Sequence, residues 1–245
     1  MAKQVNKKEK IIPLRTERRM EYGIFRYLRG EKNRRTEMIK DIVFDFGGVL
    51  IDIDTDNAIK HFGNLGIENP QEYLNSYKQA GAFYALENGD ITADEFIEEL
   101  SVLCKRPIDY NQAKEAWLSF VVKVNVEYLE YLQQLRQRYR LSVLSNTNPF
   151  LQGWARSSEF TPSGKKLDDY FDTLFLSYKM NCSKPGEEIY RKMLLEGRMN
   201  PSETLFIDDG AKNIEAARRM GINVMQVNNG EDWRPLLEKT LMAYK

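Results

Sequence analysis

An aspartate and two glycines follow a short apolar run near residue 45, and this combination could form a nucleophile. The run Ile42–Phe44 is β-branched and aromatic, as expected of a buried parallel strand, and it leads directly into Asp45. Gly47 and Gly48 then allow the backbone to turn sharply and to approach a ligand closely. Such a carboxylate lies where open α/β sheets bind their ligands, at the carboxyl end of a strand. The alternative is an ordinary loop aspartate that caps the next segment.

Three later apolar runs resemble the first, and each is also followed by polar residues. Ser145 and Asn146 end a second apolar run, Lys184 comes after a third, and Asp208 and Asp209 end a fourth. Because parallel strands end at one edge of a sheet, we expect these side chains to gather around the first aspartate. Three carboxylates in one cleft repel one another unless a cation neutralises them, and oxygen-only ligands select a hard ion such as Mg2+. A phosphate group would be bound by the lysine, the serine hydroxyl and backbone N–H groups.

The elements that must position these residues alternate between strands and helices. Helices are predicted over residues 187–196 and 211–220, each closed by a glycine. Strands alternating with helices imply right-handed crossovers and a parallel sheet covered on both faces. The expected fold class is therefore α/β, with a doubly wound parallel-sheet core. The later predicted strands are Leu141–Leu144, Thr173–Leu176, Thr204–Ile207 and Asn223–Val227.

The interval between the first two strands is too long for one crossover. About 95 residues separate them, where a single helical connection would suffice. Helices are predicted over residues 70–80, from the capping box Thr92–Glu95 onward, over 112–120 and, returning to the sheet, over 126–139. We therefore expect residues 55–125 to form a small helical cap over the strand ends. Residues 39–54 and 126–245 then form the α/β core, and residues 83–90 are expected to join two cap helices.

Charge is distributed unevenly along a chain of zero formal net charge. Residues 1–40 hold 13 Lys/Arg and 5 Asp/Glu, whereas the remainder holds 23 basic and 31 acidic residues. We interpret residues 1–38 as a basic extension that is loosely docked, in preference to a nucleic-acid or membrane contact. Met38 would itself serve as a natural beginning of the folded domain.

The cysteines and the apolar runs bear on the compartment. Cys104 and Cys182 make no metal-ligand spacing and no disulfide framework, which fits a reducing environment. No apolar run approaches a membrane span, and no secretion signal is recognisable. We expect a cytoplasmic protein, monomeric, with neither a membrane nor a nucleic acid as partner.

Four motifs resemble, in order and spacing, those of the haloacid dehalogenase-like (HAD) hydrolases. Each motif alone is weak, but four in sequence, each after a strand, are a strong signal over about residues 41–227. The resemblance implies a HAD-like Rossmannoid core with the helical C1 cap of subfamily IA. Within the superfamily, the Ser-Asn-Thr-Asn form of the second motif is most similar to bacterial phosphatases acting on α-D-glucose 1-phosphate. The motifs are Asp45–Val49, Leu144–Asn148, Lys184–Tyr190 and Phe206–Ile214.

The resemblance implies a Mg2+-dependent phosphatase of a small phosphorylated metabolite. Asp45 would become an aspartyl-phosphate that water then hydrolyses, so that one hard displacement is divided into two easier ones. Mg2+ would be held by Asp45, the main-chain carbonyl of Gly47 and Asp209, with Asp208 as a supporting or alternative ligand. The residues that would bind the phosphoryl group are Gly47, Gly48, Ser145, Asn146 and Lys184.

Gly47 departs from the pattern of many such phosphatases, in which a second aspartate at this position acts as general acid and base. Acid–base assistance is typically worth about 10²–10⁴-fold. A substrate with a good leaving group, such as a hexose 1-phosphate, would need less of it. Alternatively, Asp52, Asp54 or a cap residue substitutes, or the protein is a poor catalyst. The similar sugar-phosphate phosphatases also carry glycine, which favours the first two alternatives.

Two rival functions remain open from the sequence. A metal-independent 2-haloacid dehalogenase also uses an aspartate nucleophile, but it leaves the pair Asp208-Asp209 without a purpose. A non-catalytic phospholigand-binding protein would not need Asp45, Lys184 and an acidic pair together. Specificity is expected from the cap, where Glu87 or Asn88 could contact a substrate hydroxyl, although such residues more often only end a helix.

Overall fold

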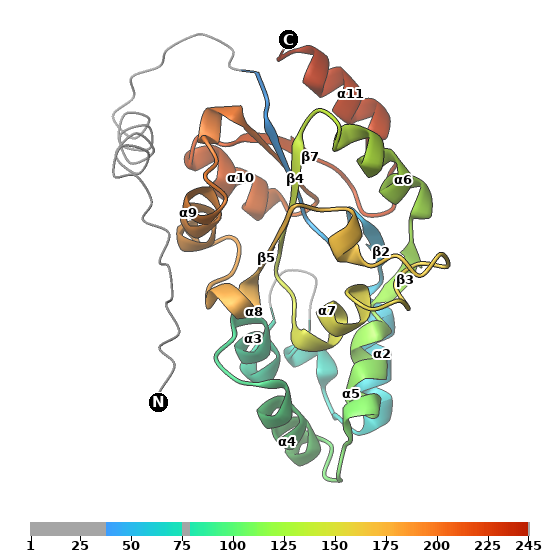
Figure 1. Cartoon of the computed structure of the whole chain (residues 1–245). Coiled ribbons are helices and arrows are strands. Elements are labelled where there is room, and N and C mark those ends of the chain that lie inside the picture. Colours follow the sequence, from blue (N-terminus) through green and yellow to red (C-terminus); the bar gives the residue numbers. More distant parts are fainter. Residues whose placement is uncertain (1–37, 75–78, 245) are drawn as a thin grey trace, which may run out of the picture.

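The computed structural model describes residues 38–74 and 79–244, which form an α/β core and a smaller helical unit beside one edge of its sheet (Figure 1). The predicted basic extension, residues 1–38, lies outside the described residues except for Met38. None of the helices within the described ranges is long and apolar enough to span a membrane.

The core is a five-stranded parallel sheet with the order β5-β4-β1-β6-β7. The central strand β1 is buried throughout and pairs in parallel with β4 and with β6. The chain winds outward from β1 in one direction and then in the other, which places a topological switch point at the end of β1. The predicted doubly wound sheet is confirmed. Its strands are β1 (Asp41–Phe44), β4 (Arg140–Ser145), β5 (Thr173–Leu176), β6 (Thr204–Asp208) and β7 (Asn223–Gln226).

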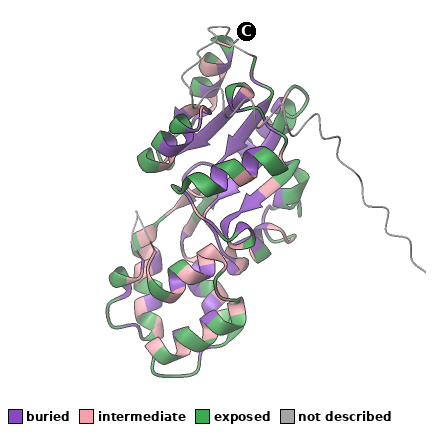
Figure 2. Cartoon of the chain, turned by 90° about the vertical axis from the view of Figure 1, so that its left-hand side faces the viewer, coloured by how far each residue is buried: buried purple, intermediate pink, exposed green. Residues whose placement is uncertain are grey.

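Helices cover both faces of this sheet, and alternate residues of β1 point to opposite faces. Ile42 and Phe44 pack in the cluster that includes α6 (Val126–Leu135) and α11 (Arg234–Met242). Val43 packs in the cluster with α9 (Glu187–Glu196) and α10 (Ala211–Arg219). Figure 2 shows the buried strands between helices whose outer faces are exposed. The remaining core elements are α7 (Pro149–Ala155), the 3-10 turn η2 (Leu167–Asp169), α8 (Ser177–Met180) and the 3-10 turn η3 (Pro201–Glu203).

The segment predicted as a cap forms a helical unit with an aromatic core of its own. Phe62, Phe83, Phe96 and Trp117 are fully buried there and contact one another at their rings. Phe150 from α7 joins this cluster, so the unit packs against a core helix. The predicted capping box at Thr92 is formed, and Asp109 caps the helix that follows it in the same way, which was not predicted. Its elements are α2 (Thr55–Leu65), the 3-10 turn η1 (Pro70–Glu72), α3 (Gly81–Asn88), α4 (Ala93–Leu103) and α5 (Tyr110–Leu118).

Two expectations for this unit are wrong. The helix predicted over residues 70–80 is, in the described residues, only the 3-10 turn η1, and the Ala80 N–H donates to the Tyr73 carbonyl instead of to a carbonyl four positions earlier. Residues 83–90, expected as a connection, belong mostly to α3, which ends at Gly89 in the left-handed conformation (φ 76°). The sequence also gave no sign of β2 (Ile51–Ile53) and β3 (Val121–Val124), an antiparallel pair that joins the unit to the core.

Candidate active site

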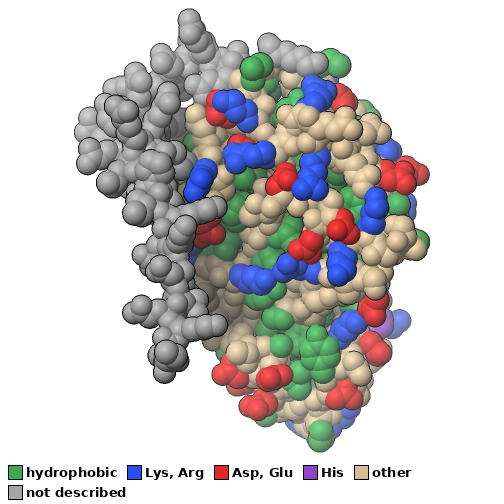
Figure 3. All heavy atoms as spheres, in the orientation of Figure 1, with side chains coloured by type: hydrophobic (Ala, Val, Ile, Leu, Met, Phe, Trp, Pro, Cys, Tyr) green, Lys and Arg blue, Asp and Glu red, His purple; other side chains and the backbone are tan. Residues whose placement is uncertain are grey.

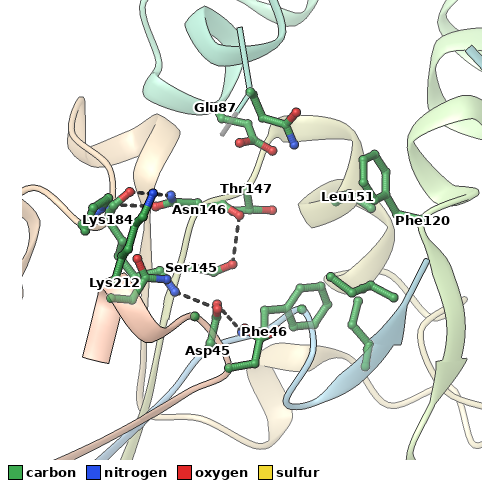
Figure 4. Close-up of a pocket in the computed structure, with 18 of the residues that line it drawn as sticks. Asp45, Phe46, Glu87, Phe120, Ser145, Asn146, Thr147, Leu151, Lys184 and Lys212 are labelled. Atoms are coloured by element: carbon green, nitrogen blue, oxygen red, sulfur yellow. Dashed lines mark hydrogen bonds and ion pairs between the residues drawn. The ribbon is translucent and has the colours of Figure 1, made fainter. Parts of the chain in front are cut away.

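A cavity of about 560 Å³ lies where the strand ends of the core meet the helical unit. Asp45, Ser145 and Asp209 line it from the core, because β1, β4 and β6 are neighbours and end at the same edge. Glu87 lines it from the helical unit (Figure 4), and so does Trp117. The topology therefore brings together side chains that are up to 164 positions apart in the sequence.

Lys184 joins two carboxylates at the floor of this cavity. Its Nζ lies 2.8 Å from Asp45 Oδ2 and 2.7 Å from Asp208 Oδ2, with the lysine side chain only 1% exposed. Burial raises the pKa of Asp45 well above its usual range; Lys184 opposes this shift, and the neighbouring Asp208 and Asp209 reinforce it. Burial alone would lower the pKa of Lys184, but Asp208 and Asp45 outweigh it and raise the pKa. The floor is thus an acid-rich site in which one buried cation partly offsets the negative charge.

The two adjacent aspartates are placed differently. Asp208 is fully buried; its Oδ2 pairs with Lys184, and its Oδ1 accepts hydrogen bonds from the Gly210 N–H (2.7 Å) and from Asn213 Nδ2 (2.9 Å). Both oxygens of Asp208 are therefore engaged. Asp209 is half-buried and lines the cavity, and burial together with Asp208 raises its pKa. Of the pair, Asp209 is the carboxylate presented to a ligand.

Three carboxylate oxygens, one each from Asp45, Asp208 and Asp209, lie within 4.8 Å of one another. Oxygen donors at this spacing suit a hard divalent cation with small shifts of the side chains. Burial and the neighbouring carboxylates raise the pKa values of Asp45 and Asp209, and a bound cation would oppose this shift by favouring the charged carboxylates. Gly47, whose carbonyl is a further expected ligand, lines the same cavity. The residues present fit Mg2+.

Gly48 is required by the close approach of Asp209. Its φ is +74°, and a Cβ at this position would lie 2.2 Å from Asp209 Oδ2. Gly48 does not line the cavity in the described structure, so the structure does not bring it together with the other predicted phosphate contacts. Its role in the geometry is to leave space for the second carboxylate.

Asn146, in the second predicted motif, forms two hydrogen bonds with the backbone of Lys184. Asn146 Nδ2 donates to the Lys184 carbonyl (2.9 Å), and the Lys184 N–H donates to Asn146 Oδ1 (2.8 Å). The Asn146 side chain therefore fixes the loop that carries the lysine, and only its backbone remains for a phosphate. The Ser145 hydroxyl, 2% exposed as a residue, lies at the cavity wall between Asp45 and Asn146 (Figure 4).

The residues that could replace the acid missing at Gly47 differ in whether they reach the cavity. Asp52 accepts a hydrogen bond from Asn125 Nδ2 (2.7 Å), and Asp54 caps α2 through the Asn57 N–H (3.0 Å); neither lines the cavity. Glu87 does line it, and burial raises the pKa of Glu87 to about 8, against the opposing effects of Asn148 and Lys184.

Asn88 points elsewhere. It is the last residue of α3, and its side chain donates to the carboxylate of Asp90. The cavity lining does not include it in the part of the chain that the structure describes. Of the two cap candidates, the structure brings only Glu87 to the site.

Several residues that line the cavity were not predicted from the sequence. Gln79, Trp117 and Phe120 come from the helical unit, and Lys212 from the first turn of α10. Trp117 lies near the end of α5 and Phe120 just beyond it, and this three-residue spacing predicts only core packing. Within the described ranges, the Trp117 Nε1 and Gln79 Oε1 atoms are buried without a hydrogen-bond partner, which suits groups that meet a ligand or water.

Comparisons with known proteins agree with this geometry. The family model described as haloacid dehalogenase-like hydrolase matches residues 42–227. The chain is 46% identical over 197 residues to the D-ribitol-5-phosphate phosphatase of Bacteroides thetaiotaomicron, covering 80% of this chain and 96% of that protein.

Solved structures are similar over the same span. A predicted HAD-like family hydrolase from Porphyromonas gingivalis superposes with a TM-score of 0.80 at 40% identity, covering 83% of this chain and 98% of that one. A HAD family enzyme of Bacteroides thetaiotaomicron, solved as an aspartate-to-alanine variant with magnesium and inorganic phosphate, superposes with a TM-score of 0.77 at 34% identity and covers 81% and 98%.

Proposed function

This chain belongs to the haloacid dehalogenase-like hydrolases, and from that premise we propose that it is a Mg2+-dependent phosphatase acting on a small sugar or sugar-alcohol phosphate. The observation that carries this proposal is the arrangement at the cavity floor. Asp45 ends the central strand, Lys184 lies 2.8 Å from it, and Asp209 stands beside it with space kept by a glycine. A nucleophile, a cation for phosphate oxygens and a metal ligand thus meet in one pocket.

Asp45 attacks the phosphorus atom in this mechanism. Its Oδ1 accepts a hydrogen bond from the Phe46 N–H (2.7 Å), which fixes the orientation of the carboxylate. Lys184 and Ser145 stabilise the charge on the phosphoryl oxygens, and Asp208 holds Lys184 in place from behind. When bound, Mg2+ neutralises the carboxylates and the phosphate oxygens. Water then hydrolyses the aspartyl-phosphate and releases inorganic phosphate.

The substrate is proposed as a phosphorylated five- or six-carbon chain. The relative with 46% identity is named for D-ribitol 5-phosphate, which makes pentitol phosphates the first class to test. The second class is the hexose 1-phosphates, supported by Gly47 and by the form of the second motif. The polar groups of Gln79 and Trp117 at the facing wall suit the hydroxyl groups of either class.

The distribution of surface charge does not favour a nucleic acid as partner. Over the described residues of the face shown in Figure 3, Lys and Arg side chains are interspersed with Asp and Glu. A nucleic-acid backbone requires a continuous basic stripe, which this face does not present. A small metabolite in the cavity is the proposed partner, and the protein is proposed to be monomeric, which light scattering on the eluted peak of a sizing column tests.

The central experiment measures phosphate release with and without Mg2+. We expect turnover of p-nitrophenyl phosphate and of D-ribitol 5-phosphate or α-D-glucose 1-phosphate that stops with a chelator and in Asp45→Asn. The matched control is Asp56→Asn, which changes an exposed carboxylate in the first turn of α2. Chloride release from a 2-haloacid without metal would instead establish a dehalogenase. Tight phosphate binding without any turnover would establish a binding protein.

A further inference from the structure

Among the described residues that line the cavity, three carry carboxyl groups, and they come from opposite walls. Asp45 and Asp209 belong to the core, at the ends of β1 and β6, whereas Glu87 belongs to α3 of the helical unit. Figure 4 shows the Glu87 carboxyl entering the cavity from the helical unit, across from Asp45. The proposed mechanism assigns a role to both core carboxylates and none to Glu87.

The position of Glu87 is the one at which the proposed reaction needs a proton. In phosphoryl transfer the attacking and leaving oxygens lie roughly in line on opposite sides of phosphorus. With Asp45 on the core side, the ester oxygen leaves toward the helical unit. The alkoxide of a polyol is a strong base, so its departure requires a proton from a nearby acid, whereas the anomeric oxygen of a hexose 1-phosphate is less basic and needs less assistance.

Among the described residues that line the facing wall, no other group can supply the proton. Gly47 has no side chain, and Lys184 is bound to Asp45 and Asp208 at the core floor. The polar groups that Gln79 and Trp117 contribute to the facing wall are an amide and an indole, which are not acids in this pH range. Glu87 is therefore the acid that the described part of the facing wall provides.

Contacts between the two units hold Glu87 in place. The Ser177 hydroxyl at the start of α8 donates a hydrogen bond to the Glu87 carbonyl. Two residues further on, a Cβ at Gly89 would lie 2.2 Å from the Tyr178 carbonyl, so the end of α3 sits directly on α8. The end of α3 that carries Glu87 is thus held against the core.

The surroundings of Glu87 favour the protonated acid at neutral pH. Burial raises its pKa to about 8, and Asn148 and Lys184 oppose the shift. Asn148 is itself fully buried, and its Nδ2 has no hydrogen-bond partner within the described part of the chain. That amide is available to the carboxylate once the proton has left.

The elements packed against α3 carry other titratable groups. On α8 these are Tyr178 and Lys179, and the Lys179 Nζ lies over the Tyr178 ring. The acidic residues of α4 are exposed, and that helix faces α3 with its apolar side. They are Asp94, Glu95, Glu98 and Glu99.

We propose that Glu87 is the general acid and base of this enzyme and takes the place of a side chain at Gly47. In the first step an Asp45 oxygen bonds to phosphorus, the bond from phosphorus to the ester oxygen breaks, and the Glu87 proton moves to that oxygen. In the second step water bonds to phosphorus, its proton returns to Glu87, and the bond to Asp45 breaks. The cycle ends with an alcohol, inorganic phosphate and both carboxyl groups restored. This inference rests on the proposed phosphatase function.

The test compares esters that do and do not need a proton to leave. We expect Glu87→Gln to lower kcat for D-ribitol 5-phosphate, or whichever sugar phosphate the wild type hydrolyses, by about 10²-fold or more. In the first step, measured as kcat/KM, the loss with p-nitrophenyl phosphate should be far smaller than with the sugar phosphate, because its leaving group departs as a stable anion; the second step, which all esters share, should be slowed equally. Across substituted phenyl phosphates the variant should depend more steeply on leaving-group basicity than the wild type. Glu99→Gln, an exposed glutamate on α4, is the matched control.

A role in binding a hydroxyl group predicts a different result. It would raise KM for the sugar phosphate and leave the dependence on leaving-group basicity unchanged, and that outcome overturns the inference. If the variant fails to fold, pH profiles of the wild type provide the test. The value of kcat/KM, which reports the first step, should fall for the sugar phosphate as pH rises above about 8, whereas kcat/KM for p-nitrophenyl phosphate should not. Identical profiles overturn the inference. Absence of any Mg2+-dependent turnover by the wild type would refute the phosphatase itself.

Discussion

Gly48→Ala tests whether the second carboxylate of the site depends on the glycine that follows the proposed nucleophile. The new Cβ would lie 2.2 Å from Asp209 Oδ2 and 2.7 Å from its Cγ. Because ordinary contacts begin near 3.4 Å, the carboxylate must move by roughly 1 Å, and a misplacement of that size at a reacting centre costs about 10²-fold in rate. The left-handed φ of +74° adds about 1–2 kcal/mol of strain for any residue with a Cβ.

Gly164→Ala separates these two effects. Gly164 has nearly the same φ, +75°, but nothing lies within 4 Å of the position its Cβ would take. Both variants should therefore lose about 1–2 kcal/mol of unfolding free energy, which lowers Tm by about 2–4 °C per kcal/mol in a chain of this size. Only Gly48→Ala should also lose activity.

The assay is phosphate release titrated with Mg2+, alongside thermal unfolding. For Gly48→Ala we expect kcat/KM to fall about 10²-fold and half-maximal activation to need more Mg2+, since a displaced Asp209 is a poorer ligand. For Gly164→Ala both quantities should stay at the wild-type level. Equal activity and equal Mg2+ dependence in the two variants would refute the assignment of Asp209 as a metal ligand kept in place by Gly48.

Three further outcomes follow from the same site. Asp208→Asn should destabilise the fold by about 3 kcal/mol in urea unfolding, because Lys184 then keeps one buried carboxylate instead of two. Asn146→Ala should lower kcat about tenfold or more through loss of the two hydrogen bonds that fix the Lys184 backbone, each worth about 1 kcal/mol, with a smaller effect on KM. Glu87 has a folded pKa near 8 against 4.5 unfolded, so the folded state binds the extra proton and stability falls as pH rises between these values. Glu87→Gln should remove this fall, so urea unfolding at pH 5 and pH 8 should show the variant gaining stability relative to wild type at the higher pH.

The core of the site was predictable because topology alone determines it. Buried apolar runs identified β1, β4 and β6 to within a residue or so, and parallel strands end at one edge of a sheet. Asp45, Ser145 and Asp209 therefore had to meet, wherever the helices lay. No side-chain geometry was needed for that inference.

The different contacts of Asp208 and Asp209 were not predictable in the same way. The two residues are adjacent and chemically identical, so the sequence predicts only that both reach the site. Their difference arises from Lys184, Gly210 and Asn213, which engage both oxygens of the first acid. Such partner choices depend on distances of a few tenths of an ångström, to which residue patterns are insensitive.

The helical unit was harder to predict for a related reason. β2 and β3 have three and four residues and lie about 70 positions apart, so neither has a local pattern that identifies it. Trp117 follows a helical spacing that equally predicts a packed core, and part of its surface does pack there while another part lines the cavity. Which face of an inserted helix meets a ligand is decided by how the insertion docks, and that is a tertiary property.

That docking bears directly on the anomaly at Gly47. A side chain there would carry an acid on the same loop as the proposed nucleophile, whereas Glu87 lies on a separate unit held to the core by Ser177 and by the close approach of Gly89. If Glu87 supplies the proton, phosphorylation of Asp45 by an alkyl ester requires the unit to be docked, while an ester with a good leaving group does not. The substrate range is then limited by the contact between α3 and α8 as well as by the pocket wall. A polyol alkoxide needs the proton, so the missing core acid does not by itself restrict the enzyme to esters that leave readily.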